Sequence, residues 1–259
     1  MIDKRKLKAE LATYVPKCVS RHLKRIRKSA EPQLLIGVGG SGLGYVSKCL
    51  ILKTFIAGDK VILFDPDGEY GKFIEPIEHE SVKMTPNISI PDDFHFLHVQ
   101  QEKFTLRPGT ADMWYMNIFH IIDVLSEQKT RKKPVWLFVK DAGYLLENST
   151  YGPKEFLYLL KRAKDNNIII TLTTQVLGRF AGDPDGKILL QNVRHAILLH
   201  MLTMDVENFV KTYHMPDSYR EMNNQLYPCF GFLYTDEELQ TIEFSYSIDS
   251  YLYSLIVRP

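Results

Sequence analysis

The sequence predicts an α/β domain of three layers, in which helices cover both faces of a mostly parallel sheet. Apolar, strand-forming runs alternate with helical runs along the chain. Residues 135–139 and 168–173 contain few polar side chains, which is typical of strands buried on both faces. A glycine-rich turn joins a strand over 34–36 to an apolar helix that reaches Phe55, which is the beginning of a βαβ phosphate-binding unit.

Hydrophobic periodicity and turn residues place the remaining elements. A second strand over 61–64 follows the turn at Gly58 and Asp59, and residues 94–99 alternate with the period of a strand. Residues 71–93 contain three prolines and are expected to be irregular. We expect helices over 4–13, 16–29, 110–127, 153–164, 205–213 and 216–224 and around 188–190, a strand over 196–199, and a hairpin of 229–234 with 241–244.

Composition and cysteine spacing limit the classes of function. The 259 residues suffice for one large α/β domain, or for a domain with an appendage, and 45% hydrophobic residues suffice for its core. The sequence has neither a run of 18 apolar residues nor the apolar core of a secretory signal, so we expect a cytoplasmic protein without a membrane span. Cys18, Cys49 and Cys229 are widely spaced, and His95 and His98 fall on opposite faces of their strand. We therefore predict no disulfide and no metal site.

The first 30 residues differ in charge from the rest of the chain. They contain ten Lys or Arg and two acidic residues, a balance of +8, and because the whole chain carries +1, the remainder carries −7. We therefore divide the chain into a basic helical segment, 1–30, and an α/β domain, 31–259. The charge indicates an anionic partner for residues 4–28, which is a lipid surface at the inner face of the cell membrane, nucleic acid such as DNA, or an acidic subunit. A solvated helix is the alternative, and Tyr14 is the only aromatic residue of the segment.

The glycine-rich turn, residues 37–44, fits two phosphate-binding patterns. Gly37, Gly39 and Gly42 satisfy the dinucleotide pattern G-x-G-x-x-G. Gly37 and Gly42 also have the spacing of the nucleoside-triphosphate P-loop, G-x-x-x-x-G-K-[ST]. In that register Leu43 and Gly44 stand where the pattern has Lys and Ser or Thr, so the ammonium and the Mg²⁺ hydroxyl are missing. A tight turn that binds nothing is the third alternative.

Three charged residues follow predicted strands and are expected near the glycine turn. Asp65 ends the strand 61–64, about 20 residues after the glycines, where the dinucleotide pattern has the acid that holds a ribose. Lys140 and Asp141 end the strand 135–139. Ligands bind beyond the carboxyl ends of parallel strands, so these residues are expected to converge there. The nucleotide-binding candidates are Gly37, Gly39, Gly40, Ser41, Gly42, Leu43, Gly44, Asp65 and Lys140.

Five collinear stretches resemble the C-terminal ATPase domain of the large energising ATPase of type IV secretion and conjugation systems, in the FtsK–HerA branch of P-loop ATPases. They are the glycine turn (Walker A), residues 64–70 (the family's D-P-E-G-E-Y element), 136–141 (Walker B), 160–164 with Thr174-Gln175 (its K-R-A-R helix and T-Q strand tip) and 249–259 (its closing segment). The resemblance covers about residues 33–259 and implies a three-layer P-loop domain of RecA/FtsK type. It also implies ATP as the ligand and an assembly, a homo- or hetero-oligomer, with other conjugation or secretion subunits.

The resemblance also assigns catalytic candidates. Asp141 matches the family's catalytic Glu and is one methylene shorter, and Glu69 lies in the D-P-E-G-E-Y element. Gln175 and Arg162 match positions near the nucleotide edge. Arg162 either acts at a subunit boundary or is an exposed cation at a helix end.

Three departures from the family pattern predict a pseudo-ATPase. Leu43 supplies no charge, Gly44 supplies no metal ligand, and Lys140 replaces the Walker B Asp that holds Mg²⁺ through water. Loss of one preorganised electrostatic contact costs about 10²–10³ in rate. We therefore expect a structural or regulatory subunit that works beside an active paralogous ATPase. ATP is its candidate ligand, and the sequence gives no support for Mg²⁺.

Two other functions stay open at this point. Lys140 can reach the phosphates from the Walker B side and replace the lost Lys and the metal, which gives a weak ATPase for DNA or protein transfer that uses partner residues. If Lys140 does not bind phosphate, we expect it to pair with Asp65 or Asp141 in an empty site. The second is a Rossmann-type protein that binds NAD or FAD, although the family match towards the C-terminus argues against it.

Overall fold

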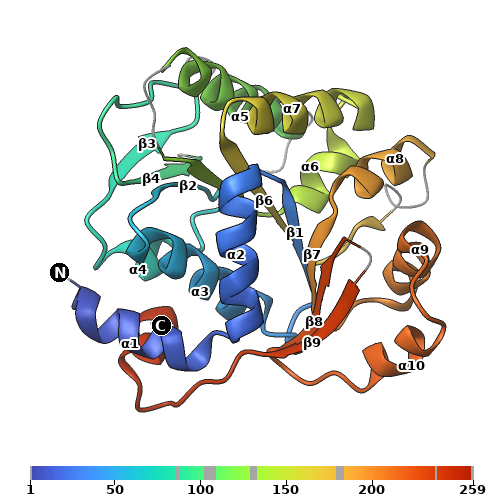
Figure 1. Cartoon of the computed structure of the whole chain (residues 1–259). Helices are drawn as coiled ribbons and strands as arrows, with labels where there is room; N and C mark the ends of the chain where they lie inside the picture. The colour runs from blue at the N-terminus through green and yellow to red at the C-terminus, as the bar shows by residue number, and fades with distance from the viewer. Residues whose placement is uncertain are drawn as a thin grey trace.

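The structure is a computed structural model that describes residues 2–85, 88–101, 109–128, 133–178, 184–236 and 238–257. Within these residues, one sheet of nine strands has the order β3-β4-β2-β5-β6-β1-β7-β8-β9 (Figure 1). The strands are β1 (Gln33–Ile36), β2 (Lys60–Phe64), β3 (Glu80–Lys83), β4 (Phe96–Gln100), β5 (Val135–Val139), β6 (Ile168–Thr174), β7 (His195–Leu198), β8 (Phe230–Thr235) and β9 (Glu238–Glu243). The predicted α/β class is confirmed.

The strand directions set the position of the glycine turn. The seven strands from β3 to β7 in the sheet order run parallel to one another, whereas the pairs β7–β8 and β8–β9 are antiparallel. β1 lies between β6 and β7, so β5 and β6 separate it from β2. In dinucleotide-binding folds the first two strands are neighbours, so this sheet has a different topology.

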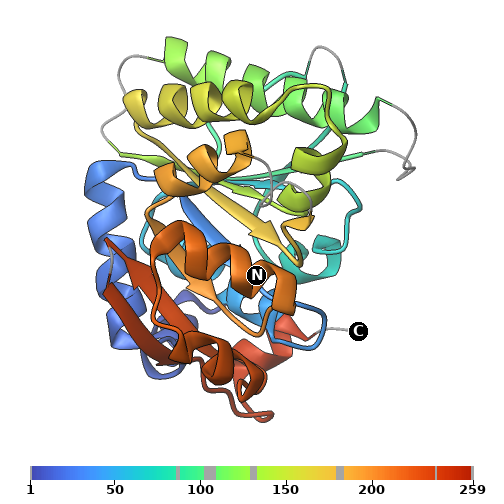
Figure 2. The same cartoon turned by 90° about the vertical axis from the view of Figure 1, so that its right-hand side faces the viewer.

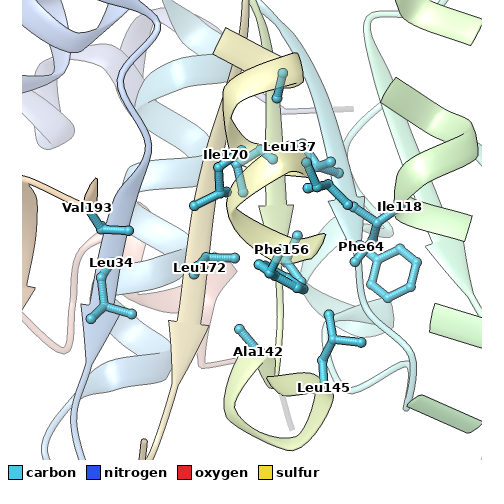
Figure 3. Packing of buried hydrophobic residues seen from close by; sticks show 14 of the residues in the cluster. Leu34, Phe64, Ile118, Leu137, Ala142, Leu145, Phe156, Ile170, Leu172 and Val193 are labelled. Atoms are coloured by element: carbon cyan, nitrogen blue, oxygen red, sulfur yellow. The ribbon is translucent and has the colours of Figure 1, made fainter. Parts of the chain in front are cut away.

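Two helical layers enclose the sheet (Figure 2). Buried residues of α5 to α10 form one apolar core with one face of the sheet, and those of α1 to α4 and α11 form a second core with the other face. Leu34 and Leu35 therefore belong to different cores, and Figure 3 shows Leu34 with Phe64, Leu137 and Ile170 in the first. The helices are α1 (Lys4–Tyr14), α2 (Lys17–Ser29), α3 (Leu43–Ile56), α4 (Gly71–Ile74), α5 (Thr110–Glu127), α6 (Ala142–Asn148), α7 (Pro153–Asp165), α8 (Pro184–Asn192), α9 (Thr203–Tyr213), α10 (Ser218–Asn224) and α11 (Tyr251–Ile256).

The basic N-terminal helices pack on the domain. Asp3 caps α1 by accepting hydrogen bonds from the N–H groups of Arg5 and Lys6, both at 3.0 Å. Leu7, Leu11, Val19, Leu23 and Ile26 point inward and join the second core, together with residues of α3 and α11. Segment 1–30 thus shares a core with the domain 31–259.

Most predicted elements agree with the structure within one or two residues, but the stretch 71–93 does not. It was expected to be irregular, and this is wrong in part, because α4 and β3 lie there. β3 is a short edge strand whose side chains are largely exposed, so it lacks the apolar alternation that marks a strand in a sequence. Pro86, Asp183 and the last two residues of the closing segment lie outside the described residues. Within the described part of the chain, the structure has no helix that could span a membrane.

Candidate functional site

The glycine turn leaves the carboxyl end of β1 and is fixed by neighbouring strands. The Gly37 N–H donates to the Thr174 carbonyl at 3.2 Å, and the Val38 N–H donates to the His200 carbonyl at 2.8 Å. The chain then reverses through Gly40 and Gly42, whose φ values of 83° and 88° lie in the left-handed region that favours glycine. α3 begins at the next residue, Leu43.

Packing explains two of the glycines. A Cβ on Gly37 would lie 2.4 Å from the Ser41 Oγ, and one on Gly42 would lie 2.6 Å from the Cys229 amide nitrogen. Cys229, just before β8, also donates its N–H to the Ser41 carbonyl at 2.8 Å. Ser41 is consequently buried beneath the turn. The start of the C-terminal hairpin thus holds the glycine turn, which the sequence did not reveal.

The outer side of the turn can accept an anion. The N–H groups of Gly39, Gly40, Gly42, Leu43 and Gly44 make no hydrogen bond with any residue that the structure describes. These groups lie at the amino end of the 14-residue helix α3, whose dipole favours negative charge. The backbone therefore fits a phosphate group, whatever the side chains do.

A cavity of about 700 Å³ faces the turn. It is lined by residues from the turn, from the tips of β2, β5 and β6, and from the chain's end: Val38, Gly39, Gly40, Gly42, Leu43, Gly44, Glu69, Tyr70, Lys140, Asp141, Thr173, Thr174, Gln175, Tyr253 and Val257. Lys140, Asp141, Glu69 and Gln175, all predicted as site residues, are thus brought together. Gly37, Ser41, Asp65 and Arg162 are not among the lining residues.

Lys140 is held by three carboxylates, and we call these four residues the Lys140 cluster. Its Nζ lies 2.6 Å from Asp67 Oδ2, 2.8 Å from Asp141 Oδ2 and 2.9 Å from Glu69 Oε2. Burial alone would lower the pKa of Lys140, but the hydrogen bonds to these carboxylates raise it above its ordinary value. Burial likewise opposes ionisation of Asp67, and its hydrogen bond with Lys140 brings its pKa below the usual range. The formal charge of the cluster is −2, three acids against one cation.

The backbone of Asp141 supports this arrangement. Asp141 has a φ of 55°, a left-handed conformation that non-glycine residues adopt at a cost of roughly 1–2 kcal/mol. It stands at the N-cap position of α6, just after β5, but its side chain makes no capping hydrogen bond and contacts Lys140 instead. Strained backbone of this kind concentrates at functional sites.

Asp65 faces away from the cavity. It is fully buried, and its Oδ2 accepts hydrogen bonds from the Tyr70 N–H at 2.9 Å and from His98 Nε2 at 3.0 Å. Burial raises its pKa, and the His98 contact offsets part of that rise. Of the two partners expected for Lys140, Asp65 or Asp141, the structure shows Asp141. Asp67 and Glu69, which follow Asp65 in the sequence, supply the other carboxylates that contact Lys140.

Arg162 lies far from the glycine turn of its own chain. It is on the last turns of α7, pairs with Asp123 of α5 and lies 5.7 Å above the Phe119 ring. α7 leads into the amino end of β6, whereas the turn faces its carboxyl end, roughly 20 Å away by strand length. A role of Arg162 at a nucleotide edge stays a prediction that needs a second subunit.

The C-terminal helix contributes residues that sequence reasoning missed. Tyr253 and Val257 line the cavity, and the Tyr253 ring stacks on Tyr246 with centroids 5.6 Å apart. The predicted closing segment contained both Tyr253 and Val257, but nothing in its spacing placed it beside the glycine turn. Lys48 Nζ of α3 donates to the Ile256 carbonyl at 3.0 Å and helps to fix this end.

The site fits a phosphate better than it fits Mg–ATP. The N–H groups of the turn are available, but Leu43 and Gly44 add neither charge nor a metal ligand. Lys140 is the cation that could replace the missing lysine, but Asp67 and Asp141 already neutralise its charge. The net negative Lys140 cluster opposes a free triphosphate, and its oxygens are suitable metal ligands only if the ammonium leaves.

The sheet order, the glycine turn at the tip of β1 and the charged tip of β5 match the fold of P-loop ATPases. No protein-family model matches the sequence, and no curated protein matches it. Among solved structures, VirB4 of Thermoanaerobacter pseudethanolicus is similar with a TM-score of 0.68 and 12% identity over 83% of this chain and 90% of that chain. The expected fold resemblance is thereby confirmed.

Two further structures are similar. The genome packaging NTPase B204 from Sulfolobus turreted icosahedral virus 2, in complex with AMPPCP, has a TM-score of 0.60 and 14% identity over 84% of this chain and 100% of that chain. The bacterial conjugative coupling protein TrwBdeltaN70, in complex with sulphate, has a TM-score of 0.63 and 8% identity over 85% of this chain and 86% of that chain. At these identities the likeness concerns the fold.

Proposed function

We propose that this chain is a catalytically degenerate ATPase-like subunit of a conjugation or type IV secretion machine, with a structural or regulatory role. The observation that carries the proposal is the Lys140 cluster, in which three carboxylates lie within 2.9 Å of the only cation among the described residues that line the cavity. Similarity to VirB4 and to a conjugative coupling protein supports the kind of machine. Its partners would be other subunits, among them an active paralogous ATPase.

ATP hydrolysis at this site would lack the charges that stabilise its transition state. Phosphoryl transfer needs positive charge around the terminal phosphate and a held metal ion. Leu43, Gly44 and the neutralised Lys140 supply none of these. Each missing contact costs about 10²–10³ in rate, although such effects are not additive. The free N–H groups of the turn would still allow ATP or its phosphates to bind without turnover.

Calorimetric titration with ATP, with and without Mg²⁺ and beside NAD, tests the proposal. We expect ATP binding that does not depend on Mg²⁺, or none, and no phosphate release. The matched variant Leu43→Lys with Gly44→Ser restores the missing ammonium and hydroxyl, and it should gain Mg²⁺-dependent binding. Steady ATP turnover by the pure wild-type protein, abolished by Asp141→Ala, would overturn the proposal.

A weak ATPase that uses Lys140 is the second candidate, because Lys140 and Asp141 line the same cavity as the free N–H groups. It requires the ammonium to leave its three carboxylates when nucleotide binds. Lys140→Ala should then weaken ATP binding at least tenfold, and an unchanged affinity would exclude this candidate. A dinucleotide-binding protein is disfavoured, because Asp65 is buried against His98 and cannot hold a ribose in the cavity.

A further inference from the structure

The outer face of α2 carries a row of exposed cations. Lys17, Arg21, Lys24 and Lys28 are exposed and recur every three or four residues, which places them along one side of the helix. We call these four residues the basic stripe. None of them forms an ion pair with the described residues. Figure 1 shows α2 on the outside of the molecule, at the front of the view.

Among the described residues, the acids that pair with α2 contact cations outside the basic stripe. Asp236 pairs with Arg25, and Asp59 pairs with Arg27 at 2.5 Å. Glu10 of α1 accepts hydrogen bonds from the N–H groups at the start of α11. The described residues therefore leave the four positive charges of the basic stripe without an ion pair, although the net charge of the chain is only +1. Exposed like charges in a row repel each other, so an external polyanion would stabilise them.

We propose that the basic stripe binds the phosphate backbone of duplex nucleic acid without reading its sequence. Eleven residues separate Lys17 from Lys28, which spans about 17 Å along a helix. One strand of a B-form duplex presents a phosphate about every 3.4 Å, so about five phosphates match the four cations.

The surroundings of the stripe favour a duplex over a lipid surface and over single-stranded nucleic acid. Val19, Leu23 and Ile26, the apolar face of α2, are buried in the core, so the helix has nothing to insert into a lipid bilayer. Within the described residues, no large hydrophobic side chain of α2 is exposed, so there is also no stacking platform for single-stranded bases. A membrane contact of residues 4–28 is the alternative that the vesicle measurement below tests.

The test is fluorescence anisotropy of a labelled 30-base-pair duplex with the full chain, at 50 to 200 mM salt. Four phosphate contacts predict a slope of log K against log salt of about −3.6, or a loss of about 150-fold in affinity over this range. The stripe variant changes all four residues to Gln and should remove most of the slope. Its matched control changes four exposed or half-exposed lysines elsewhere and should stay within about threefold of wild type; these are Lys83, Lys161, Lys187 and Lys211.

Three results would overturn the proposal. They are equal losses in the stripe variant and its control, tighter binding of single strands than of the duplex, and tighter binding of vesicles with 30% anionic lipid. Circular dichroism shows whether both variants fold. Binding should not require ATP, so a failure here is distinguishable from a failure of the proposed ATPase-like role.

Discussion

Replacing Lys140 with methionine tests the arrangement of the Lys140 cluster. Methionine keeps the apolar stem but removes the charge, so Asp67, Glu69 and Asp141 would face each other unpaired. Removal of one partner from a buried ion pair costs about 3–5 kcal/mol. The three carboxyl side chains are 26%, 62% and 31% exposed, so water screens part of their repulsion. We expect the free energy of unfolding to fall by about 2 kcal/mol at pH 7.

The pH dependence gives this prediction a second readout. The hydrogen bond with Lys140 lowers the folded-state pKa of Asp67, so its contribution to stability is present above pH of about 4 and is lost as the pH falls through the lowered value. The variant lacks this contribution. The difference between wild type and Lys140→Met should therefore be largest near pH 7 and should narrow at pH 3.5, as measured by urea unfolding followed by circular dichroism.

Lys164→Met is the matched control. Its pair with Glu31, at 2.5 Å, has side chains 44% and 23% exposed and stands outside the cavity. Such a pair contributes up to about 1 kcal/mol. If Lys140→Met cost no more than Lys164→Met at pH 7, the ammonium of Lys140 would be free in solution. The argument for a neutralised site would then be refuted.

Three further predictions concern the turn and the core. Gly42→Ala places a methyl group 2.6 Å from the Cys229 nitrogen at positive φ and should lower the free energy of unfolding in urea by about 2–3 kcal/mol. Gly44→Ala meets open space and should raise it by up to about 1 kcal/mol, so equal effects of the two variants would contradict the packing argument. Burial lowers the pKa of His22 to about 4, so the unfolded state binds more protons below pH 6.5, and the free energy of unfolding of wild type should fall by about 2 kcal/mol from pH 7 to pH 5. A fall of the same size in His22→Gln would exclude His22 as the cause. Asp65→Asn should lower the melting temperature by several degrees, and an unchanged value in a thermal scan would show that its bond with His98 is not stabilising.

The sequence predicted the elements whose boundaries have a local cause. The helix at 110–127 was predicted with its observed bounds, because its apolar residues recur with helical period. β5 also agrees, since Pro134 precedes five apolar residues. The edge strand β3 has neither signal. Its place is set by pairing with β4, which a local pattern cannot show.

The contacts at the site depended on strand tips and were harder to predict. That Lys140 and Asp141 reach the glycine turn followed from the shared edge of a parallel sheet. The direction of Asp65 did not, because the chain leaves β2 at this residue and the alternation of the strand no longer decides the side chain's direction. His98 of β4 then provides a buried partner for Asp65, and the carboxylates that reach Lys140 come from Asp67 and Glu69, beyond the turn.

The glycine turn also separates what the fold requires from what a ligand would require. Contacts with Ser41 and Cys229 leave no space for a side chain at Gly37 or Gly42, so these two residues would be needed in a site that binds nothing. Gly44 has open space and an ordinary helical conformation, so neither packing nor backbone geometry requires a glycine there. A side chain at this position would, however, stand beside N–H groups that lack a protein acceptor. The feature of this turn that favours a bound phosphate is therefore the set of N–H groups without a protein acceptor, whereas the lack of a hydroxyl at Gly44 argues against Mg²⁺-dependent hydrolysis.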